Sequence, residues 1–217
     1  MTGMKPTGGG LYRAFGKRVL DILFALFLLP PAALLVLPSM AVVKAQSPGP
    51  ALFIQRRPGK GGKPFNLYKL RTMISQTERD GRPLSDMERV TGFGRVVRAM
   101  SIDELPQLLN ILKGDMSFIG PRPLLMQYLP LYTPFQARRH EVRPGISGWA
   151  QVNGRNALTW DEKFTLDVWY VDHLSLRLDI KIVGMTLRRV LNREGVNADE
   201  GVTMQPFTGN EGRSNNV

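Results

Sequence analysis

Residues 19–43 read VLDILFALFLLPPAALLVLPSMAVV, and this almost continuously apolar stretch decides the fold class of the chain. Its 25 residues are enough for a straight helix to cross a bilayer. Pro30 and Pro31 divide it into arms of about 16 and 18 Å, each well short of a hydrocarbon core of roughly 30 Å. Because Pro31 cannot donate its amide and its ring clashes with the preceding turn, we expect a sharp bend there. A kinked spanning helix is the alternative.

Basic residues flank both ends of this stretch. They are Arg13, Lys17 and Arg18 before it, and Lys44, Arg56 and Arg57 after it. Cationic flanks prefer the cytoplasmic side of a membrane, so a straight crossing would put one cluster on the opposite face. The sequence therefore predicts a re-entrant membrane hairpin, built as helix, break and helix, that enters and leaves one leaflet from the cytoplasmic side.

The composition narrows the class of protein. At 217 residues the chain is long enough for one core with an appendage, and its 43% hydrophobic content excludes a wholly disordered protein. It has no cysteine, which excludes a disulfide framework and a thiolate metal site. A cleaved signal peptide fits poorly with the cysteine-free, basic continuation.

The charge distribution indicates a membrane partner rather than nucleic acid. The formal net charge of +11 would ordinarily raise nucleic acid as a partner. Residues 1–77, however, hold eleven lysines and arginines against the single acid Asp21, so +10 of the excess lies around the apolar stretch. A basic belt beside apolar sequence is typical of contact with an anionic membrane surface, and we expect no nucleic-acid partner.

The rest of the chain carries signals for strands and helices. Residues 51–57 and 65–72 are β-like and favour a hairpin, because the residues between them lack the spacing of a phosphate-binding loop. Residues 105–112 are predicted to form a buried helix. Thr159 and Glu162 have capping-box spacing. The stripe that follows is predicted to face the core and consists of Trp160, Phe164, Val168 and Val171.

A later amphipathic face leaves two interpretations open. Its apolar residues are Ile180, Val183, Leu187, Val190 and Leu191. Such a face either packs against the rest of the domain or lies in the membrane interface.

The candidate chemistry lies in residues 101–107, which read SIDELPQ. Asp103 and Glu104 are adjacent carboxylates, and a carboxylate can attack a phosphorus or glycosyl centre when the electrophile is neutralised and held in line. The spacing of Ser101 and Glu104 also fits a capping box, in which case the carboxylate merely caps a helix. Pro106 leaves a further possibility, a helix that starts there and leaves both carboxylates on the connection before it.

Basic residues elsewhere are candidates for phosphate binding. Arg122 is held between two prolines, so its planar guanidinium is preorganised to bind phosphate through two hydrogen bonds. Lys69 and Arg71 alternate on a predicted strand, which would direct both toward one side. Arg155 lies in the turn-rich residues 143–156 and is a candidate for contact with a diphosphate or a nucleotide. The two histidines, His140 and His173, are expected to be hydrogen-bonded or surface residues rather than acid–base catalysts.

Together these motifs resemble those of the small monotopic phosphoglycosyl transferases that start bacterial glycan assembly, and among them the transferases acting on diacetylated bacillosamine. The resemblance covers residues 17–209. Its markers are Lys17-Arg18-x-x-Asp21, Lys69-x-Arg71-Thr72-Met73, Asp103-Glu104-Leu105, Gly114-Asp115-Met116-Ser117, Gly120-Pro121-Arg122-Pro123, Arg143-Pro144-Gly145 and GWAQVNGRN at residues 148–156. One departure is the pair Pro30-Pro31, where family members commonly have Ser-Pro.

The resemblance implies a ping-pong transfer of a sugar 1-phosphate from a UDP-sugar to undecaprenyl phosphate, with release of UMP. The sugar donor is expected to be UDP-N,N'-diacetylbacillosamine or a related N-acetylated UDP-sugar. Asp103 is the implied nucleophile, which forms a covalent phosphosugar intermediate. Glu104 is implied to assist Mg²⁺ and the acceptor, so both carboxylates are implied metal ligands. The implied substrate-binding residues are Lys69, Arg71, Arg122, Pro123 and Arg155.

We therefore predict an α/β, mostly helical, membrane-associated enzyme of the bacterial inner membrane, with its active site on the cytoplasmic face. Its predicted parts are a flexible leader at 1–16, the re-entrant hairpin at 17–45, a catalytic domain at 46–200 and a polar tail at 201–217. The catalytic domain is expected to carry a short β-hairpin and amphipathic interfacial helices. The alternative is a non-catalytic, basic, membrane-anchored interaction protein. The oligomeric state stays open.

Overall fold

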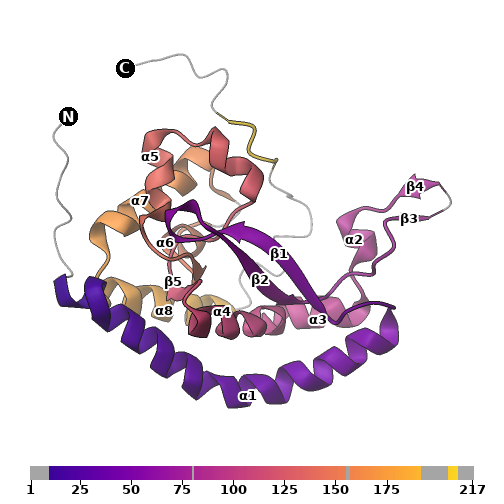
Figure 1. Ribbon diagram of the computed structural model, residues 1–217. Coiled ribbons are helices and arrows are strands. Elements are labelled where there is room, and N and C mark those ends of the chain that lie inside the picture. The colour runs from indigo at the N-terminus through magenta and orange to yellow at the C-terminus, as the bar shows by residue number, and fades with distance from the viewer. Residues whose placement is uncertain (1–9, 80, 155–156, 192–204, 210–217) are drawn as a thin grey trace. The chain divides into compact units, whose positions relative to one another are not determined.

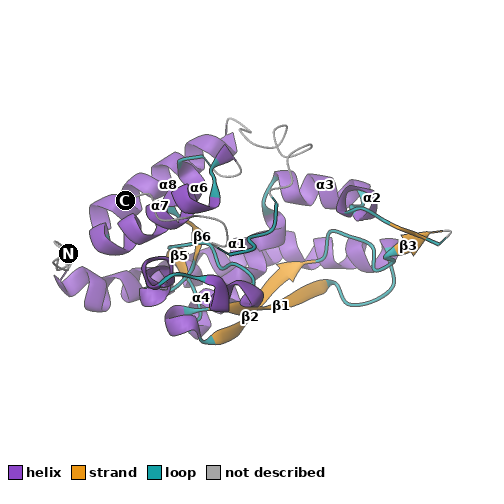
Figure 2. Cartoon of the chain, turned by 90° about the horizontal axis from the view of Figure 1, so that it is seen from above, coloured by secondary structure: helices purple, strands orange, loops and turns teal. Residues whose placement is uncertain are grey.

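The computed structural model describes residues 10–79, 81–154, 157–191 and 205–209. It is mostly helical with a few short strands, as the sequence predicts (Figure 2). The described residues form two compact units. The first unit comprises the described parts of Met1–Asp21, Arg56–Phe65 and Gly114–Val217, and the second comprises Ile22–Gln55 and Asn66–Lys113.

The apolar stretch forms α1, Lys17–Gln46, which directly follows a π-helical turn at Tyr12–Gly16. This helix is unbroken through Pro30 and Pro31, so the predicted helix-break-helix is wrong in its break. The φ angle of proline is compatible with a helix, and losing one hydrogen bond bends a helix without having to end it. In Figure 1, α1 is accordingly curved rather than straight.

The side chains of α1 are largely exposed and apolar. Phe27 and Leu34 are 76% and 77% exposed, and Leu23 and Leu37 are more than half exposed. The helical residues Tyr12–Gln46 reach a mean hydropathy of 2.4, and only 17% of the most apolar window is buried. The helix is therefore long and apolar enough to cross a membrane, and an exposed apolar surface of this length indicates association with lipid.

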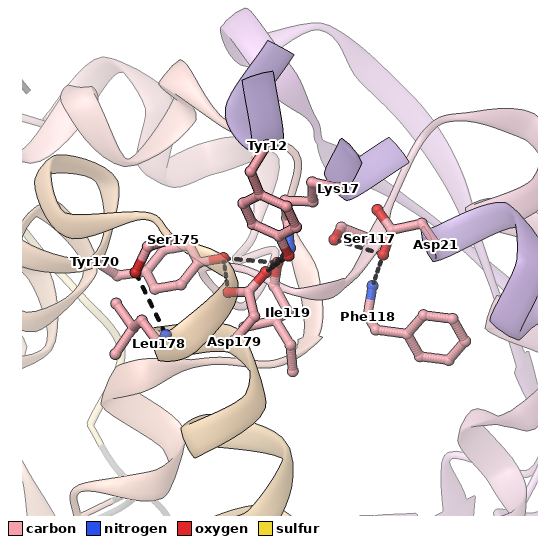
Figure 3. Close-up of polar contacts among 10 residues, drawn as sticks. All are labelled: Tyr12, Lys17, Asp21, Ser117, Phe118, Ile119, Tyr170, Ser175, Leu178 and Asp179. Carbon is pink, nitrogen blue, oxygen red and sulfur yellow. Dashed lines mark hydrogen bonds and ion pairs between the residues drawn. The ribbon is translucent and has the colours of Figure 1, made fainter. Parts of the chain in front are cut away.

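Buried carboxylates attach the first turns of α1 to the first unit. Figure 3 draws these bonds: Asp179 accepts from the hydroxyls of Tyr12 and Tyr170 and from Lys17 Nζ, and Asp21 accepts from the Ser117 hydroxyl and the Phe118 amide. The Lys17–Asp179 ion pair is 2.6 Å long, with both side chains largely buried. Lys17 and Asp21 of the predicted Lys17-Arg18-x-x-Asp21 motif thus have a structural role at the start of the apolar helix.

The first unit is built from short elements around α7, Trp160–His173, and α8, Leu176–Leu191. Its other elements are β5 (Ser117–Ile119), a 3₁₀-helix at Met126–Leu131, α5 (Pro134–Ala137), a 3₁₀-helix at Arg138–Glu141, β6 (Gly145–Ser147) and α6 (Trp149–Val152). Strands β5 and β6 pair in parallel, with Ser117 opposite Gly145 and Ile119 opposite Ser147.

The capping box predicted at Thr159 and Glu162 begins α7 and is confirmed. The predicted stripe of α7 is also confirmed, because Phe164, Val168 and Val171 are all buried. An aromatic cluster packs on this helix and contains Tyr128, Tyr132, Trp160, Phe164 and Phe207. Phe207 belongs to residues 201–217, predicted to be a polar tail, yet its side chain is only 5% exposed.

Of the apolar face predicted for α8, Ile180, Val183, Leu187 and Val190 are exposed, and the side chain of Leu191 lies outside the described residues. The buried contacts of α8 are instead made by Leu178 and Ile182, which join a core with Ile119, Val142 and Tyr170. The exposed stripe consists of Leu176, Ile180, Val183, Leu187 and Val190, with Arg177, Lys181 and Arg188 exposed beside it. The interpretation of this face as packing against the domain is therefore wrong, and its location in the membrane interface stays a prediction.

The second unit contains most of α1 and of the predicted β-hairpin. Strands β1 (Leu52–Pro58) and β2 (Pro64–Leu70) form a two-stranded sheet as predicted, and their connection includes a 3₁₀ turn at Lys60–Gly62. The remaining elements are β3 (Glu78–Arg79) with β4 (Arg82–Pro83), α2 (Asp86–Arg89), α3 (Gly92–Ala99), a 3₁₀-helix at Ile102–Gln107 and α4 (Leu108–Lys113). The core of this unit consists of Val43, Ala51, Leu70 and Val97.

Candidate active site

The two adjacent carboxylates lie on the 3₁₀-helix Ile102–Gln107 of the second unit. Ser101, which precedes this helix, is left-handed with φ +55° and makes no side-chain capping bond. The capping-box interpretation of Ser101 and Glu104 is therefore wrong, and the helix starts at Ile102 rather than at Pro106. Asp103 is only 3% exposed, which is unusual for a carboxylate without a structural capping role.

Lys69 of β2 approaches both carboxylates. Its Nζ lies 2.8 Å from Asp103 Oδ2 and 3.5 Å from Glu104 Oε1. We call Lys69, Asp103 and Glu104 the carboxylate cluster. The single ammonium offsets part of the repulsion between the two carboxylates. Sequence reasoning proposed Lys69 as a phosphate ligand but did not pair it with Asp103.

Arg71 has a different position from the one that alternation on a strand predicts. Its Nη1 donates to the Pro48 carbonyl at 2.6 Å and to the Ser75 hydroxyl at 2.9 Å, and its Nη2 donates to the Ser47 carbonyl at 2.7 Å. β2 ends at Leu70, so the strand geometry does not extend to Arg71. The guanidinium is buried against the residues that follow α1 and stabilises that connection, and its role in phosphate binding stays a prediction.

Arg122 lies in the first unit, in the segment that follows β5. This segment is fixed by backbone bonds, from the Gly120 amide to the Ser147 carbonyl and from the Gly145 amide to the Pro121 carbonyl. The strands approach so closely that a Cβ on Gly145 would lie 2.1 Å from the Gly120 nitrogen, which explains both glycines. The exposed Arg122 side chain and Pro123 line a small pocket, which we call the arginine pocket. Its other lining residues are Pro58, Pro121, Arg139, His140, Val142 and Pro144.

Arg57 adds a second guanidinium near Arg122 that sequence reasoning treated only as a membrane flank. Its Nη1 lies 3.4 Å from the Pro123 carbonyl. Burial lowers the pKa of Arg57 to about 10, and the positive charge of Arg122 contributes to this shift. Two guanidinium groups of like charge repel each other, and a bound phosphate would relieve that repulsion.

His140, the histidine beside this pocket, is hydrogen-bonded, as predicted. His140 Nδ1 lies 3.2 Å from the Gly59 carbonyl. Burial lowers the pKa of His140 to about 4, and the charge of Arg139 lowers it further. The imidazole is therefore neutral at physiological pH. Arg155, the remaining predicted ligand, falls outside the described residues.

The carboxylate cluster is compatible with the magnesium ion that the resemblance implies. In the described part of the chain, no group of three or more His, Cys, Asp or Glu side chains could hold a metal ion. Mg²⁺ commonly binds through one or two carboxylates together with water and substrate phosphates, so a complete protein cage is not required. The oxygen donors of Asp103 and Glu104 fit that mode of binding.

Comparison with known proteins identifies the family. The model of the bacterial sugar transferase family matches residues 12–193. The uncharacterised sugar transferase EpsL of Bacillus subtilis is 56% identical over 193 residues, which cover 89% of this chain and 96% of that protein. The matched residues 12–193 include α1, both carboxylates and Arg122.

Two further relatives carry a more specific name. An undecaprenyl-phosphate N-acetylgalactosaminephosphotransferase of Aeromonas hydrophila is 44% identical over 84% of this chain, which spans only 45% of that protein. A UDP-glucose:undecaprenyl-phosphate glucose-1-phosphate transferase of Caulobacter vibrioides is 43% identical over 82% of this chain and 70% of that protein. The likeness to bacillosamine transferases in particular stays a prediction, whereas the resemblance to small phosphoglycosyl transferases is confirmed. This chain belongs to the bacterial sugar transferase family.

Proposed function

We propose that this protein transfers a sugar 1-phosphate from a UDP-sugar to undecaprenyl phosphate and releases UMP. The observation that carries the proposal is the carboxylate cluster, in which the buried Asp103 is paired with Lys69 at 2.8 Å. The alternative function was an interaction protein whose carboxylates form a capping box with Ser101. It is not supported, because Ser101 makes no side-chain capping bond. The names of the relatives from Aeromonas and Caulobacter support the same reaction class.

The proposed reaction has two steps, the formation and the breakdown of a covalent intermediate on Asp103. A carboxylate oxygen of Asp103 attacks the phosphorus next to the sugar, so an oxygen–phosphorus bond forms while the bridging bond to the UMP phosphate breaks. UMP leaves with the bonding electron pair. An oxygen of undecaprenyl phosphate then attacks the same phosphorus, the bond to Asp103 breaks, and the carboxylate is regenerated. Lys69 orients Asp103 and offsets the negative charge of the approaching diphosphate.

Arg122 and Arg57 have the complementary task of binding phosphate. The guanidinium of Arg122 offers paired donors to phosphate oxygens, and its proline neighbours restrict the backbone that carries it. When bound, Mg²⁺ supplies neutralisation of the substrate phosphates, and Asp103 and Glu104 are the residues that would hold it. The relatives from Aeromonas and Caulobacter are named for different sugars, so the sugar of the UDP-sugar donor has to be identified by experiment.

The decisive test is UMP release from a panel of UDP-sugars with undecaprenyl phosphate and Mg²⁺ in detergent or nanodiscs. The panel contains UDP-glucose, UDP-galactose, UDP-N-acetylgalactosamine and UDP-N,N'-diacetylbacillosamine. We expect at least one donor to give sustained release that requires the lipid phosphate and stops when EDTA removes the metal. A binding protein would release no UMP from any of them, and that result would refute the proposal.

The protein is proposed to lie in one leaflet of the inner membrane, with its active site on the cytoplasmic face. The curvature of α1, the basic residues at both of its ends and the exposed apolar stripe of α8 support this arrangement. UDP-sugars are cytoplasmic, and a stripe lying in the interface would place the domain beside the head group of the lipid acceptor.

We predict that Leu187 of α8 contacts lipid whereas Arg188, its neighbour, does not. An environment-sensitive fluorophore is attached to Leu187→Cys or to Arg188→Cys in this cysteine-free chain, and the protein is placed in nanodiscs. The two residues are both exposed but lie about 100° apart around the helix. We expect a blue-shifted, lipid-quenchable emission only from position 187. Equal emission from both positions would show that the stripe does not enter the interface.

A re-entrant course of α1 predicts that both chain ends lie on the cytoplasmic side. Single-cysteine variants Thr7→Cys and Asn210→Cys are expected to resist an impermeant thiol reagent applied to intact cells, and to react with a permeant one. The permeant reagent is the control for accessibility. Labelling of position 7 alone by the impermeant reagent would show that α1 crosses the membrane.

A further inference from the structure

A buried ion pair, whose arginine is part of the lining of the arginine pocket, was not among the predicted site residues. Arg139, on the 3₁₀-helix Arg138–Glu141, is 2% exposed, and Asp167, on α7, is 4% exposed. Arg139 donates to Asp167 Oδ2 from Nη2 at 2.7 Å and from Nε at 3.0 Å. This arrangement fixes the plane of the guanidinium firmly against α7.

The same guanidinium also reaches the proposed phosphate-binding segment. Arg139 Nη2 donates to the backbone carbonyl of Arg122 at 2.8 Å, and Nη1 donates to the Tyr132 hydroxyl at 3.4 Å. A continuous series of contacts therefore runs from Asp167 through Arg139 to the backbone of Arg122. All of these residues belong to the first unit.

Stability alone is a weak reason for such a pair. Taking two charges out of water is costly, and apolar replacements of a buried pair are often neutral or stabilising. Burial raises the pKa of Asp167 although the charge of Arg139 opposes this, which reflects the same desolvation cost. The buried arginine has a specific function here, because its charged, planar guanidinium donates to the carboxylate and to the Arg122 carbonyl at the same time.

The two neighbouring prolines restrict the backbone of Arg122 only in part, and the hydrogen bond from Arg139 restricts it further. Pro121 and Pro123 each fix their own φ angle, and Pro123 also restricts Arg122 to extended backbone. The peptide between Arg122 and Pro123 can still rotate within this extended range. Arg139 donates to the oxygen of that peptide and so fixes its orientation. Because the Arg122 side chain leaves from this backbone, holding the carbonyl also aims the guanidinium.

We propose that Arg139 and Asp167 are positioning residues that act through Arg122, holding its backbone so that its guanidinium is aimed at the substrate diphosphate. The inference rests on the proposed function, in which Arg122 binds that diphosphate. Neither residue touches the substrate itself. Their effect on turnover therefore depends on Arg122 being present.

The test uses the full-length protein and the UDP-sugar of the panel that the wild type turns over fastest. Arg139→Met combined with Asp167→Leu replaces the pair by apolar side chains of similar volume, and is expected to keep the melting temperature within a few degrees. We expect kcat/KM to fall at least about tenfold, since oriented contacts to a transition state commonly contribute that much. The matched control is Asp172→Asn, which removes the half-buried partner of Arg138 between the same two elements and is expected to leave kcat/KM unchanged.

A double-mutant cycle with Arg122→Lys separates positioning from a general structural role. If Arg139 acts through Arg122, the apolar pair should change the rate of Arg122→Lys by less than about twofold, a strongly non-additive result. Additive losses, or full activity of a folded apolar pair, would overturn the inference. If the apolar pair fails to fold, the same cycle is run with Arg139→Lys, which keeps the charge but loses the fork. Absence of UMP release by the wild type would instead refute the proposed function, and the inference with it.

Discussion

Asp103→Asn is expected to reduce UMP release to the background of the assay while leaving the protein folded. The amide keeps the shape of the side chain but is not a nucleophile toward phosphorus, so the first step cannot occur. Lys69 keeps Glu104 within 3.5 Å and is partly exposed, so the loss of one carboxylate does not strand a fully buried charge. The measurements are UMP release at saturating UDP-sugar and the melting temperature of the same preparation.

The control for this variant is Asp86→Asn, which removes a carboxylate that is 79% exposed and pairs weakly with Arg89 at 3.7 Å. Wild-type activity is expected there. Mass spectrometry after incubation with UDP-sugar without the lipid acceptor should find the sugar phosphate on Asp103 in the wild type and nowhere in Asp103→Asn. Near-normal turnover of Asp103→Asn, or a modification on another residue, would show that Asp103 is not the nucleophile.

Two Ser/Thr-x-x-Glu sequences illustrate what could be read from local sequence. Thr159 and Glu162 form the predicted capping box because Thr159 has extended backbone at φ −64° and ψ 165°. Ser101 and Glu104 have the same spacing, but the tight turn between α3 and the 3₁₀-helix holds Ser101 at φ +55°. The side chain of a left-handed residue cannot reach the helix amides in the capping geometry. The spacing is a local property, whereas the backbone angle is set by how two helices are connected.

Long-range partners explain the other differences. Strand periodicity placed Arg71 beside Lys69, but the partners of Arg71 are carbonyls 23 and 24 residues away. Arg139 and Asp167 are 28 residues apart and share no sequence pattern. In α8 the periodicity identified an apolar stripe correctly, yet Leu178 and Ile182 offered a second apolar face, and only the tertiary packing decides which one is buried.

For α1, too, local sequence predicted some features and long-range contacts determine the others. Length and hydropathy correctly indicated a helix that is long and apolar enough to cross a membrane. The prolines bend the helix without interrupting it, because each removes one amide donor while its φ angle remains helical. Lys17 and Tyr12 bind Asp179, which is more than 160 positions away in the sequence. No local sequence pattern therefore predicts these contacts.

Arg122→Lys is expected to lower kcat/KM by about a hundredfold without changing the fold. A lysine keeps the positive charge but replaces a planar fork by a single rotating ammonium, so paired hydrogen bonds to the diphosphate are lost. Losing one preorganised donor to developing charge commonly costs about 10² to 10³ in rate. The Arg122 side chain is exposed and the contact with Arg139 is made by the backbone carbonyl, so the substitution leaves that contact in place. The measurement is steady-state UMP release against UDP-sugar concentration.

The matched control is Arg138→Lys, the same chemical change at an arginine that pairs with Asp172 and Glu141 on the surface of the same unit. Exposed ion pairs contribute little, roughly 0 to 1 kcal/mol, so both activity and melting temperature should stay close to the wild type. The repulsion between the like charges of Arg57 and Arg122 makes a further distinction possible. If a general positive potential were sufficient, Arg122→Lys would retain nearly full activity and a rise in ionic strength would weaken both proteins equally. A large loss in Arg122→Lys at every salt concentration, absent from Arg138→Lys, requires the directed geometry of the guanidinium at position 122.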